Sequence, residues 1–309
     1  MQLVTLGGAA LRLSPPGTER LETTTRFDAG VTGPECNAAV AARRLGAEAV
    51  WLSRLAATPA GRRVEREFRA SGVDVVADAV DGRQGIAFVE RGSEPRGDER
   101  VDDLDGSVVE SLAMESLPAE RVETADTAYV SSATPRRSPT TAGATAKFLK
   151  TATDAATTTA FGLLDTRGWS KLDAAKDTVE GLFPAVDVLV ATDDAVETIL
   201  GRDGEPAALL HTLASSYDLD VVAMRRRGDA AVWQDSTVHE FTRPAVDAVD
   251  TAGAVDAFVG AFLATLDDGA QEALRTAIAA DALTQTTPGA QLNASRREVE
   301  AVATGVERP

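Results

Sequence analysis

One segment of the sequence combines small residues with acidic ones at a spacing that suits phosphate chemistry. It runs Asp250-Thr-Ala-Gly-Ala-Val-Asp256, and apolar residues at helical spacing follow it from Ala257 onward. The first amides of a helix have no internal acceptor and carry partial positive charge, and small residues let a phosphate approach them. A carboxylate in that first turn can take the proton of an attacking hydroxyl. Phosphoryl transfer to an alcohol and an ordinary helix start with an acidic first turn are equally compatible with this segment alone.

A second segment, near the N-terminus, places a polar residue at the start of an alanine-rich pattern. It reads Gly30-Val-Thr-Gly33-Pro-Glu-Cys-Asn37, and the residues that follow are apolar at the spacing of one helix face. A plain amphipathic helix with an asparagine in its first turn is the alternative to a ligand site here.

The elements that position these segments alternate along the chain. Strand-like apolar runs cover residues 3–7, 49–55, 127–132, 157–165, 186–192 and 219–225. Helical patterns cover residues 34–45, 61–71, 141–152 and 194–200. Strands that alternate with helices predict an α/β fold with a mainly parallel central sheet covered on both faces.

Two segments break this alternation, at about residues 9–30 and 83–110. They are rich in charge and in the residues that form turns, such as Pro15-Pro16 and the run from Gly92 to Gly97, with short alternating pieces between. We expect them to leave the main sheet and to form a small β-sheet lid.

The charge of the chain restricts the partners that it can have. The formal net charge is −17, and only four of the 31 basic residues are lysine. Such a surface disfavours nucleic acid, because phosphate binding needs a basic face. Acid-rich, lysine-poor chains are typical of salt-loving organisms, where screening relieves self-repulsion. An ordinary acidic protein is the alternative.

The chain carries no signal for export or for a membrane. No apolar run approaches the length that spans a bilayer, and the N-terminus has the pattern of a first strand and lacks a basic leader. We therefore expect a cytoplasmic protein without a membrane partner. Cys36 is the single cysteine, so one thiol cannot build a disulfide framework or a thiolate metal site.

Both segments resemble signatures of the PfkB family of carbohydrate kinases, D-T-x-G-A-G-D-x-F and G-G-x-x-x-N. The resemblance covers nearly the whole chain and implies a ribokinase-like three-layer sandwich over residues 1–309. It implies that Asp256 is the catalytic base and that the amides of Gly253, Ala254 and Val255 form an anion hole. Val255 stands where the family has a second glycine, so a stiff side chain is added to the loop.

Within the family, the opening LGGAALRLSPPG is similar to that of 2-keto-3-deoxygluconate kinases, which makes this sugar acid the expected substrate. The resemblance implies that Gly33 lies at the substrate and that Asn37 bonds a sugar hydroxyl. A carboxylate needs a fixed arginine, and Arg96 and Arg167 are the candidates. Other family positions have changed, and they now read Gly8, Asp102, Leu104, Gly162, Leu164 and Thr166.

The resemblance also implies ATP and Mg²⁺, and it leaves K⁺ open. The phosphate turn of the family corresponds to Met224 and the arginines after it, which either clamp phosphates or balance an acidic surface. Asp193 and Asp194 are the expected metal carboxylates. A homodimer is expected, since lids of this family often pair. The predicted nucleotide-binding residues are Arg225, Arg227, Gly228, Thr251 and Gly289.

Two functions remain open from the sequence. An active ATP-dependent sugar kinase is favoured by the retained Asp256, because a chain released from catalysis need not keep a costly buried carboxylate. A catalytically weakened or inactive paralogue that binds sugar or nucleotide is favoured by the changes at Val255, Gly8, Leu104, Leu164 and Met224.

Overall fold

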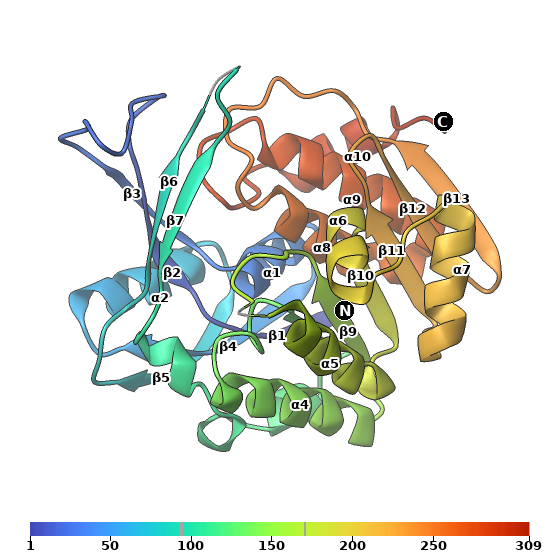
Figure 1. Ribbon diagram of the computed structural model, residues 1–309, viewed down its shortest axis with the longest axis horizontal. Coiled ribbons are helices and arrows are strands. Elements are labelled where there is room, and N and C mark those ends of the chain that lie inside the picture. The colour runs from blue at the N-terminus through green and yellow to red at the C-terminus, as the bar shows by residue number, and fades with distance from the viewer. Residues whose placement is uncertain (93–94, 170, 309) are drawn as a thin grey trace.

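A nine-stranded sheet forms the centre of the computed structural model, which describes residues 1–92, 95–169 and 171–308 (Figure 1). Across the sheet the order is β13-β12-β11-β10-β9-β8-β1-β4-β5. All neighbours from β11 to β5 in this order are parallel, while β12 and β13 pair antiparallel at one edge. The strands are β1 (Gln2–Leu6), β4 (Glu48–Ala56), β5 (Asp74–Val80), β8 (Thr127–Ser131), β9 (Thr158–Leu163), β10 (Val188–Thr192), β11 (Val221–Arg225), β12 (Asp229–Gln234) and β13 (Thr237–Thr242).

The predicted α/β fold with a mainly parallel sheet is confirmed, and all six strand-like runs of the sequence are strands of this sheet. Three further strands, β5, β12 and β13, are not evident from the sequence as apolar runs. They lie at or next to the two edges of the sheet, where many of their side chains are only half-buried. Partial burial relaxes the demand for apolar residues and so weakens the sequence signal.

Helices cover both faces of this sheet and give three layers. On β1, Val4 and Leu6 point into one core and Leu3 into the other, because successive side chains of a strand alternate. The first core is closed by α4 (Pro139–Asp154), α5 (Leu172–Leu182) and α7 (Pro206–Tyr217). The second is closed by α1 (Pro34–Arg44), α8 (Ala254–Thr265) and α9 (Ala270–Thr284), with α2 (Pro59–Ala70) and α10 (Arg296–Ala303) packed beside them.

Short helical pieces fill the connections. The helix predicted over residues 194–200 is instead α6 (Asp193–Ala195) followed by a π-helical turn (Val196–Leu200). The other pieces are α3 (Glu120–Glu123) and the 3₁₀ turns Val108–Ser111, Met114–Ser116, Phe183–Ala185 and Leu266–Asp268. Within the described residues, none of the helices is long and apolar enough to cross a membrane.

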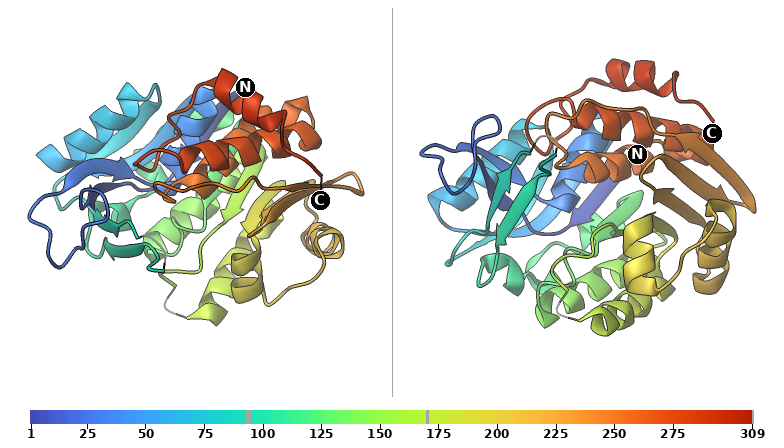
Figure 2. Two further views of the ribbon diagram at one scale, coloured as in Figure 1. Left: turned by 90° about the horizontal axis from the view of Figure 1, so that it is seen from above. Right: turned by 45° about the horizontal axis from the view of Figure 1, so that its top comes forward.

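A second, four-stranded sheet stands at one end of the main sheet, as both views of Figure 2 show. Its strands come from the two turn-rich segments and follow the order β3-β2-β6-β7, with β2 and β6 parallel and the other pairs antiparallel. They are β2 (Ala10–Ser14), β3 (Asp28–Thr32), β6 (Ile86–Glu90) and β7 (Glu99–Asp103). Residues 93 and 94 of the predicted lid lie outside the described residues. We call this sheet the lid.

Helices α1 and α8 pack closely because small residues line their contact. A side chain on Gly260 of α8 would overlap the backbone carbonyl of Ala38 in α1, so only glycine fits there. Alanines 41, 257 and 261 continue the contact and are fully or almost fully buried. This close approach brings the first turns of the two helices together, and those turns carry Asn37 and Asp256.

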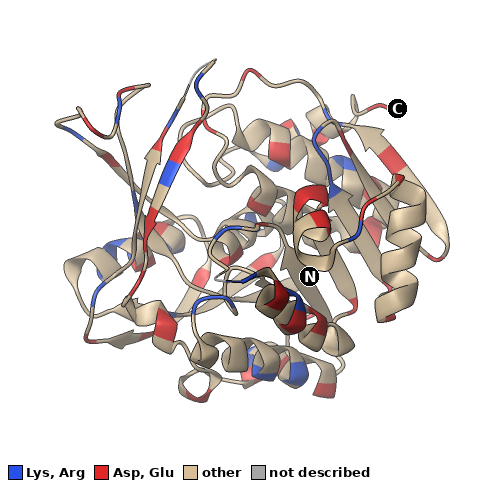
Figure 3. Ribbon diagram, viewed as in Figure 1, with Lys and Arg blue, Asp and Glu red and all other residues tan. Residues whose placement is uncertain are grey.

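The charge of the protein predicts how its stability depends on salt. Acidic residues occur on the lid, on the outer strands of the main sheet and on the helices that cover it, and the net charge is −17 (Figure 3). Screening weakens repulsion among exposed like charges, since the Debye length falls from about 10 Å at 0.1 M salt to about 3 Å at 1 M. We expect the melting temperature to rise steadily over a KCl series from 0.1 to 3 M. A flat or falling series would show that self-repulsion does not limit stability.

Candidate active site

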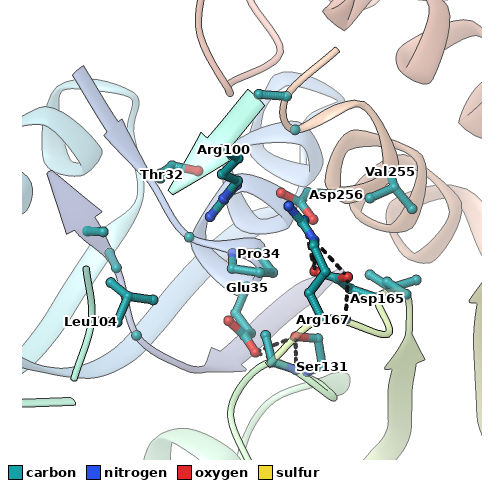
Figure 4. A pocket seen from close by; sticks show the side chains of 18 of the residues that line it. Thr32, Pro34, Glu35, Arg100, Leu104, Ser131, Asp165, Arg167, Val255 and Asp256 are labelled. Carbon is teal, nitrogen blue, oxygen red and sulfur yellow. Dashed lines mark hydrogen bonds and ion pairs between the residues drawn. The ribbon is translucent and has the colours of Figure 1, made fainter. Parts of the chain in front are cut away.

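A pocket of about 500 Å³ lies between the lid and the ends of the central strands (Figure 4). The lid contributes Ala10, Val89 and Arg100, and the main domain contributes the ends of β8 and β9 and the first turns of α1 and α8. Of the residues predicted for the site, the following line this pocket: Gly33, Arg167, Thr251, Gly253, Val255 and Asp256. Residues far apart in the sequence therefore meet at the carboxyl edge of the parallel sheet, where α/β folds usually bind ligands.

Asp256 lies in the first turn of α8, and its carboxylate is almost completely buried. The amide nitrogen Nδ2 of Asn37 donates a hydrogen bond of 2.8 Å to Oδ2 of Asp256. Burial raises the pKa of Asp256 to about 7, although the bond from Asn37 opposes that shift. A carboxylate with a pKa near neutrality is a stronger proton acceptor than an exposed aspartate, and it is about half ionised at pH 7 and mostly ionised at pH 8.

The structure places Asn37 behind Asp256 and outside the pocket lining. The amide of Asn37 donates to the candidate base, and the expected bond from Asn37 to a sugar hydroxyl stays a prediction. Gly33 does line the pocket, and a side chain there would lie 2.5 Å from the carbonyl oxygen of Gly8, so the close approach of two backbone segments requires glycine. Asn37 consequently orients the carboxylate, whereas Gly33 shapes the wall.

Glu35 is a second buried carboxyl group beside the site, and the sequence pattern did not single it out. Its Oε1 accepts hydrogen bonds from the amide and hydroxyl of Ser131 and from the hydroxyl of Thr134. Burial raises the pKa of Glu35, and its negative charge in turn contributes to the raised pKa of Asp256. Glu35 follows the pocket glycine by two residues, which is the only sequence signal that could have drawn attention to it.

The start of α8 has the shape expected of an anion hole. Gly253 caps the helix with φ 75°, in the left-handed region, and a side chain there would overlap the carbonyl of Ala290. The amides of Ala254 and Val255 follow in the first turn, where a helix offers no internal acceptors. In the close-up, the Val255 side chain points away from the Asp256 carboxylate (Figure 4). It therefore does not separate the base from the space in front of it.

The pocket is lined by more arginines than the sequence motifs predicted. Arg167 lies beside Asp256 and is bound to Asp165, with Nε 3.0 Å from either carboxylate oxygen (Figure 4). Arg96, the other predicted substrate residue, is instead paired with Glu90 in the lid and lies outside the lining. The further arginines of the lining are Arg100, Arg136 and Arg137.

Two of the changed family positions have been filled by neighbouring side chains. A side chain on Gly8 would overlap Val109, and one on Gly162 would lie 2.5 Å from the hydroxyl of Tyr129. Leu104 and Leu164 both line the pocket and add apolar surface to it. The polar residues lost at these places have thus been replaced by packing, which leaves a closed pocket wall.

The predicted nucleotide residues are dispersed, because Thr251 lines the pocket and the others lie outside its lining. Arg225 forms a two-point ion pair with the buried Asp281, at 3.0 and 3.2 Å, and Arg243 binds the same carboxylate. Arg227 and Gly228 are exposed at the adjoining turn. Arg225 is therefore committed to the fold, and Arg227 is the most exposed of the three arginines at this turn.

The loop before α8 is tied to the lid. Arg12 of β2 donates to Oδ2 of Asp250 at 2.6 Å in an ion pair with both side chains buried, and the amide of Gly289 donates to the same oxygen. Thr251 donates to Asp98, which precedes β7, at 2.6 Å. Gly289 and Thr251, both predicted to bind nucleotide, thus hold the loop before α8 in place.

The two sheets, the lid pocket and the buried carboxylate at a helix start define a sugar kinase with the ribokinase-like fold. The chain matches the model of the pfkB family carbohydrate kinases over residues 2–297, and it belongs to that family. The predicted family and fold are confirmed.

Curated relatives of this chain phosphorylate sugar derivatives. It is 40% identical to a 2-dehydro-3-deoxygalactonokinase of Haloferax volcanii, over 98% of this chain and 97% of the relative. It is 31% identical to an ATP-dependent ribose-1-phosphate kinase of Halopiger xanaduensis, over 84% and 81%. Among solved structures, a 2-dehydro-3-deoxygluconokinase of Thermotoga maritima matches with a TM-score of 0.93 and 26% identity, covering 99% of this chain and 98% of that one.

The buried Asp256 predicts an effect on stability that does not depend on any substrate. Its folded pKa of about 7 exceeds its ordinary value of 3.8, so the ionised form is disfavoured by folding. The free energy of unfolding should therefore fall as pH rises between these values and level off above 7, a difference on the order of 4 kcal/mol. Asp256→Asn removes this titration and keeps an acceptor for Asn37.

Chemical denaturation of both proteins at pH 5 and pH 8 tests this prediction. We expect the variant to exceed the wild type in stability by a clearly larger margin at pH 8. Equal margins at the two pH values would mean that Asp256 titrates as an ordinary exposed aspartate.

Proposed function

We propose that this enzyme transfers the γ-phosphoryl group of ATP to a hydroxyl of a 2-keto-3-deoxy sugar acid. The observation that supports it most directly is the buried Asp256 at the start of α8, facing a pocket lined by four arginines. A neutral sugar would not need so many cations, whereas a carboxylate-bearing sugar does.

In this proposal Asp256 accepts the proton of the attacking hydroxyl. The oxygen of that hydroxyl forms a bond to the γ-phosphorus while the bond from the γ-phosphorus to the β,γ-bridging oxygen breaks and ADP leaves. The first-turn amides of Ala254 and Val255 stabilise the charge that develops on the phosphoryl oxygens. Asn37 holds the carboxylate in place from behind, and the lid excludes water from the reacting groups.

The start of α8 fits a phosphate group, because the first-turn amides follow Gly253, whose left-handed conformation and close contact with Ala290 set the course of the loop. Arg227 and Gly228 lie at the neighbouring turn and are proposed to contact the nucleotide. Mg²⁺ would neutralise the phosphates of ATP when bound. Asp193 and Asp194 are the proposed carboxylates near it, and no group of three or more metal-binding side chains occurs within residues 1–92, 95–169 and 171–308. The ion would thus be held largely by phosphate and water.

The names of the relatives bear on which sugar acid is used. The 40% identical relative is a kinase for the galacto epimer, while the Thermotoga structure and a 28% identical relative from Thermoproteus tenax are kinases for the gluco epimer. The two compounds differ in the configuration of one hydroxyl, so we propose that the enzyme accepts both or favours one of them. The relative that acts on ribose 1-phosphate makes an anionic sugar phosphate the second candidate.

We further propose a cytoplasmic homodimer that pairs through the outer face of the lid. Phe27 and Val101 are among the few large apolar side chains that are exposed, and both belong to the lid. Phe88 lies between them: its ring packs edge-on against Phe27, and it pairs in register with Val101. An apolar sheet face of this kind is usually covered by a partner. We propose that K⁺ acts through general screening of the net charge of −17.

A coupled ADP-release assay tests the substrate. The panel comprises 2-keto-3-deoxygalactonate, 2-keto-3-deoxygluconate, ribose 1-phosphate and neutral hexoses, each measured in 0.1 M and 2 M KCl. We expect one of the two keto acids to give the highest kcat/KM. A preference for ribose 1-phosphate or a neutral hexose would overturn the substrate assignment and leave the kinase class standing.

Two substitutions at the start of α8 test the mechanism. Asp256→Asn should lower kcat by roughly 10²- to 10⁴-fold, the usual range for a general base, while ATP still binds. Val255→Gly restores the glycine of the family motif, and because the Val255 side chain points away from the base we expect a change in kcat of less than about tenfold, corresponding to about 1.4 kcal/mol. Full activity of Asp256→Asn on the confirmed substrate would show that Asp256 is not the general base and serves only at the start of the helix.

A further inference from the structure

Arg136 is the most deeply buried arginine of the substrate pocket, and its charge is not matched by a hydrogen bond. It follows β8, and its side chain is 6% exposed. Its Nε and Nη1 atoms are buried, and neither makes a hydrogen bond to any residue that the structure describes. A buried guanidinium without acceptors is costly, so a side chain in this state points to a missing ligand.

The nearest acid does not satisfy Arg136. Asp165 lies 3.6 Å from Nη2 of Arg136, which is beyond hydrogen-bond distance. The same carboxylate accepts three hydrogen bonds from Arg167, two from Nε and one from the backbone amide. The Asp165 carboxylate is therefore hydrogen-bonded to Arg167, and Arg136 interacts with it only as a charge at 3.6 Å. Burial accordingly lowers the pKa of Arg136, although Asp165 counteracts this effect.

The loop after β9 leaves room beside the Arg136 guanidinium. Gly168 has φ 79°, in the left-handed region, and a side chain there would come within 3.2 Å of Nε of Arg136. Glycine thus allows the loop to turn over the guanidinium without filling the space next to it. Since β8 and β9 are parallel neighbours, their ends place Arg136 and this loop on the same side of the pocket.

The other pocket arginines are better satisfied or less enclosed. Arg100 binds Asp102 at 2.8 Å, and Arg167 binds Asp165. Arg137 also lines the pocket, but none of its nitrogens is among the buried side-chain atoms that lack a partner within the described residues. Arg136 alone among these four combines nearly complete burial with guanidinium nitrogens that lack acceptors within the described part of the chain.

We propose that Arg136 binds the carboxylate of the substrate and is the residue that makes this enzyme prefer sugar acids to neutral sugars. This assignment rests on the proposed function. A carboxylate supplies two acceptor oxygens and one negative charge, which match the planar donors of a guanidinium. A neutral sugar would leave the buried Arg136 cation unpaired. Selectivity for the acid therefore comes from the cost of that unpaired cation as well as from the bond to the carboxylate.

The test compares one sugar acid with its neutral counterpart. The pair is the preferred 2-keto-3-deoxy acid and the 3-deoxyhexulose in which a hydroxymethyl group replaces the carboxylate. For Arg136→Met we expect kcat/KM for the acid to fall by roughly 100-fold, mostly through KM, as for loss of a charge-assisted contact. For the deoxyhexulose it should fall by less than about threefold or rise, because methionine removes the unpaired cation. Arg62→Met, at an exposed position of α2, is the neutral control.

Arg167→Met and Arg137→Met test, in the same experiment, whether another pocket arginine binds the carboxylate. An acid-selective loss in either of them, with none in Arg136→Met, overturns the assignment. Equal losses for the acid and the deoxyhexulose in Arg136→Met also overturn it, because the residue would then only support the pocket. Arg136→Lys is the control for a loss of activity that is caused by misfolding of Arg136→Met. It keeps the charge without the planar fork, and we expect a loss for the acid between that of Arg136→Met and the wild type.

A binding measurement separates this proposal from the proposed function. The melting temperature of each protein is measured with the keto acid and without ATP. If the acid raises the melting temperature of the wild type but not of Arg136→Met, the assignment stands even where no phosphorylated product forms. If the acid neither stabilises the wild type nor is phosphorylated, both proposals fail. If it stabilises both proteins equally, only the Arg136 assignment fails.

Discussion

The hydrogen bond between Asn37 and Asp256 is the contact on which the rest of the site depends. It joins the first turns of α1 and α8, and it exists because Gly260 lets α8 approach the backbone of Ala38. Close packing makes the carboxylate dry, and dryness raises its pKa to about 7. The loss of stability caused by burying Asp256 and the raised pKa of its carboxylate thus have one cause, which is the contact between small residues of α1 and α8. A larger residue at position 260 would separate the two helices and weaken the Asn37–Asp256 hydrogen bond.

The lid is coupled to the anion hole by charge as well as by shape. Arg12 reaches from the lid to Asp250, and Thr251 reaches back to Asp98, so two successive residues of the loop before α8 are held by lid residues. The amide of Gly289 completes the hold on Asp250. Because the Arg12–Asp250 pair is buried, removing either partner would leave an uncompensated charge. The position of the lid and the geometry of the phosphate cradle are therefore linked in this protein.

Much of the fold could be predicted from the sequence, because buried parallel strands leave continuous apolar runs and small-residue loops leave a motif. The edge strands β5, β12 and β13 could not, since half-exposed strands need no such runs. For the site, the motif indicates Gly253 and Asp256 because glycine conformation and helix position are local properties. Arg136 could not be predicted, since its importance arises from burial and from the commitment of Asp165 to Arg167, which are properties of the tertiary structure.

The changes at family positions are better understood as a repacked pocket than as decay. Val109 occupies the space beside Gly8, and the Tyr129 hydroxyl lies beside Gly162, so lost polar groups have not left voids. Under relaxed selection, buried charges that have no function would be lost first, because they are the groups that lower stability most. Here Asp256, Glu35 and Arg136 all remain buried around one pocket. Two buried carboxyl groups and a buried cation around one pocket lower the stability of the fold, which is the pattern expected where selection maintains a functional site.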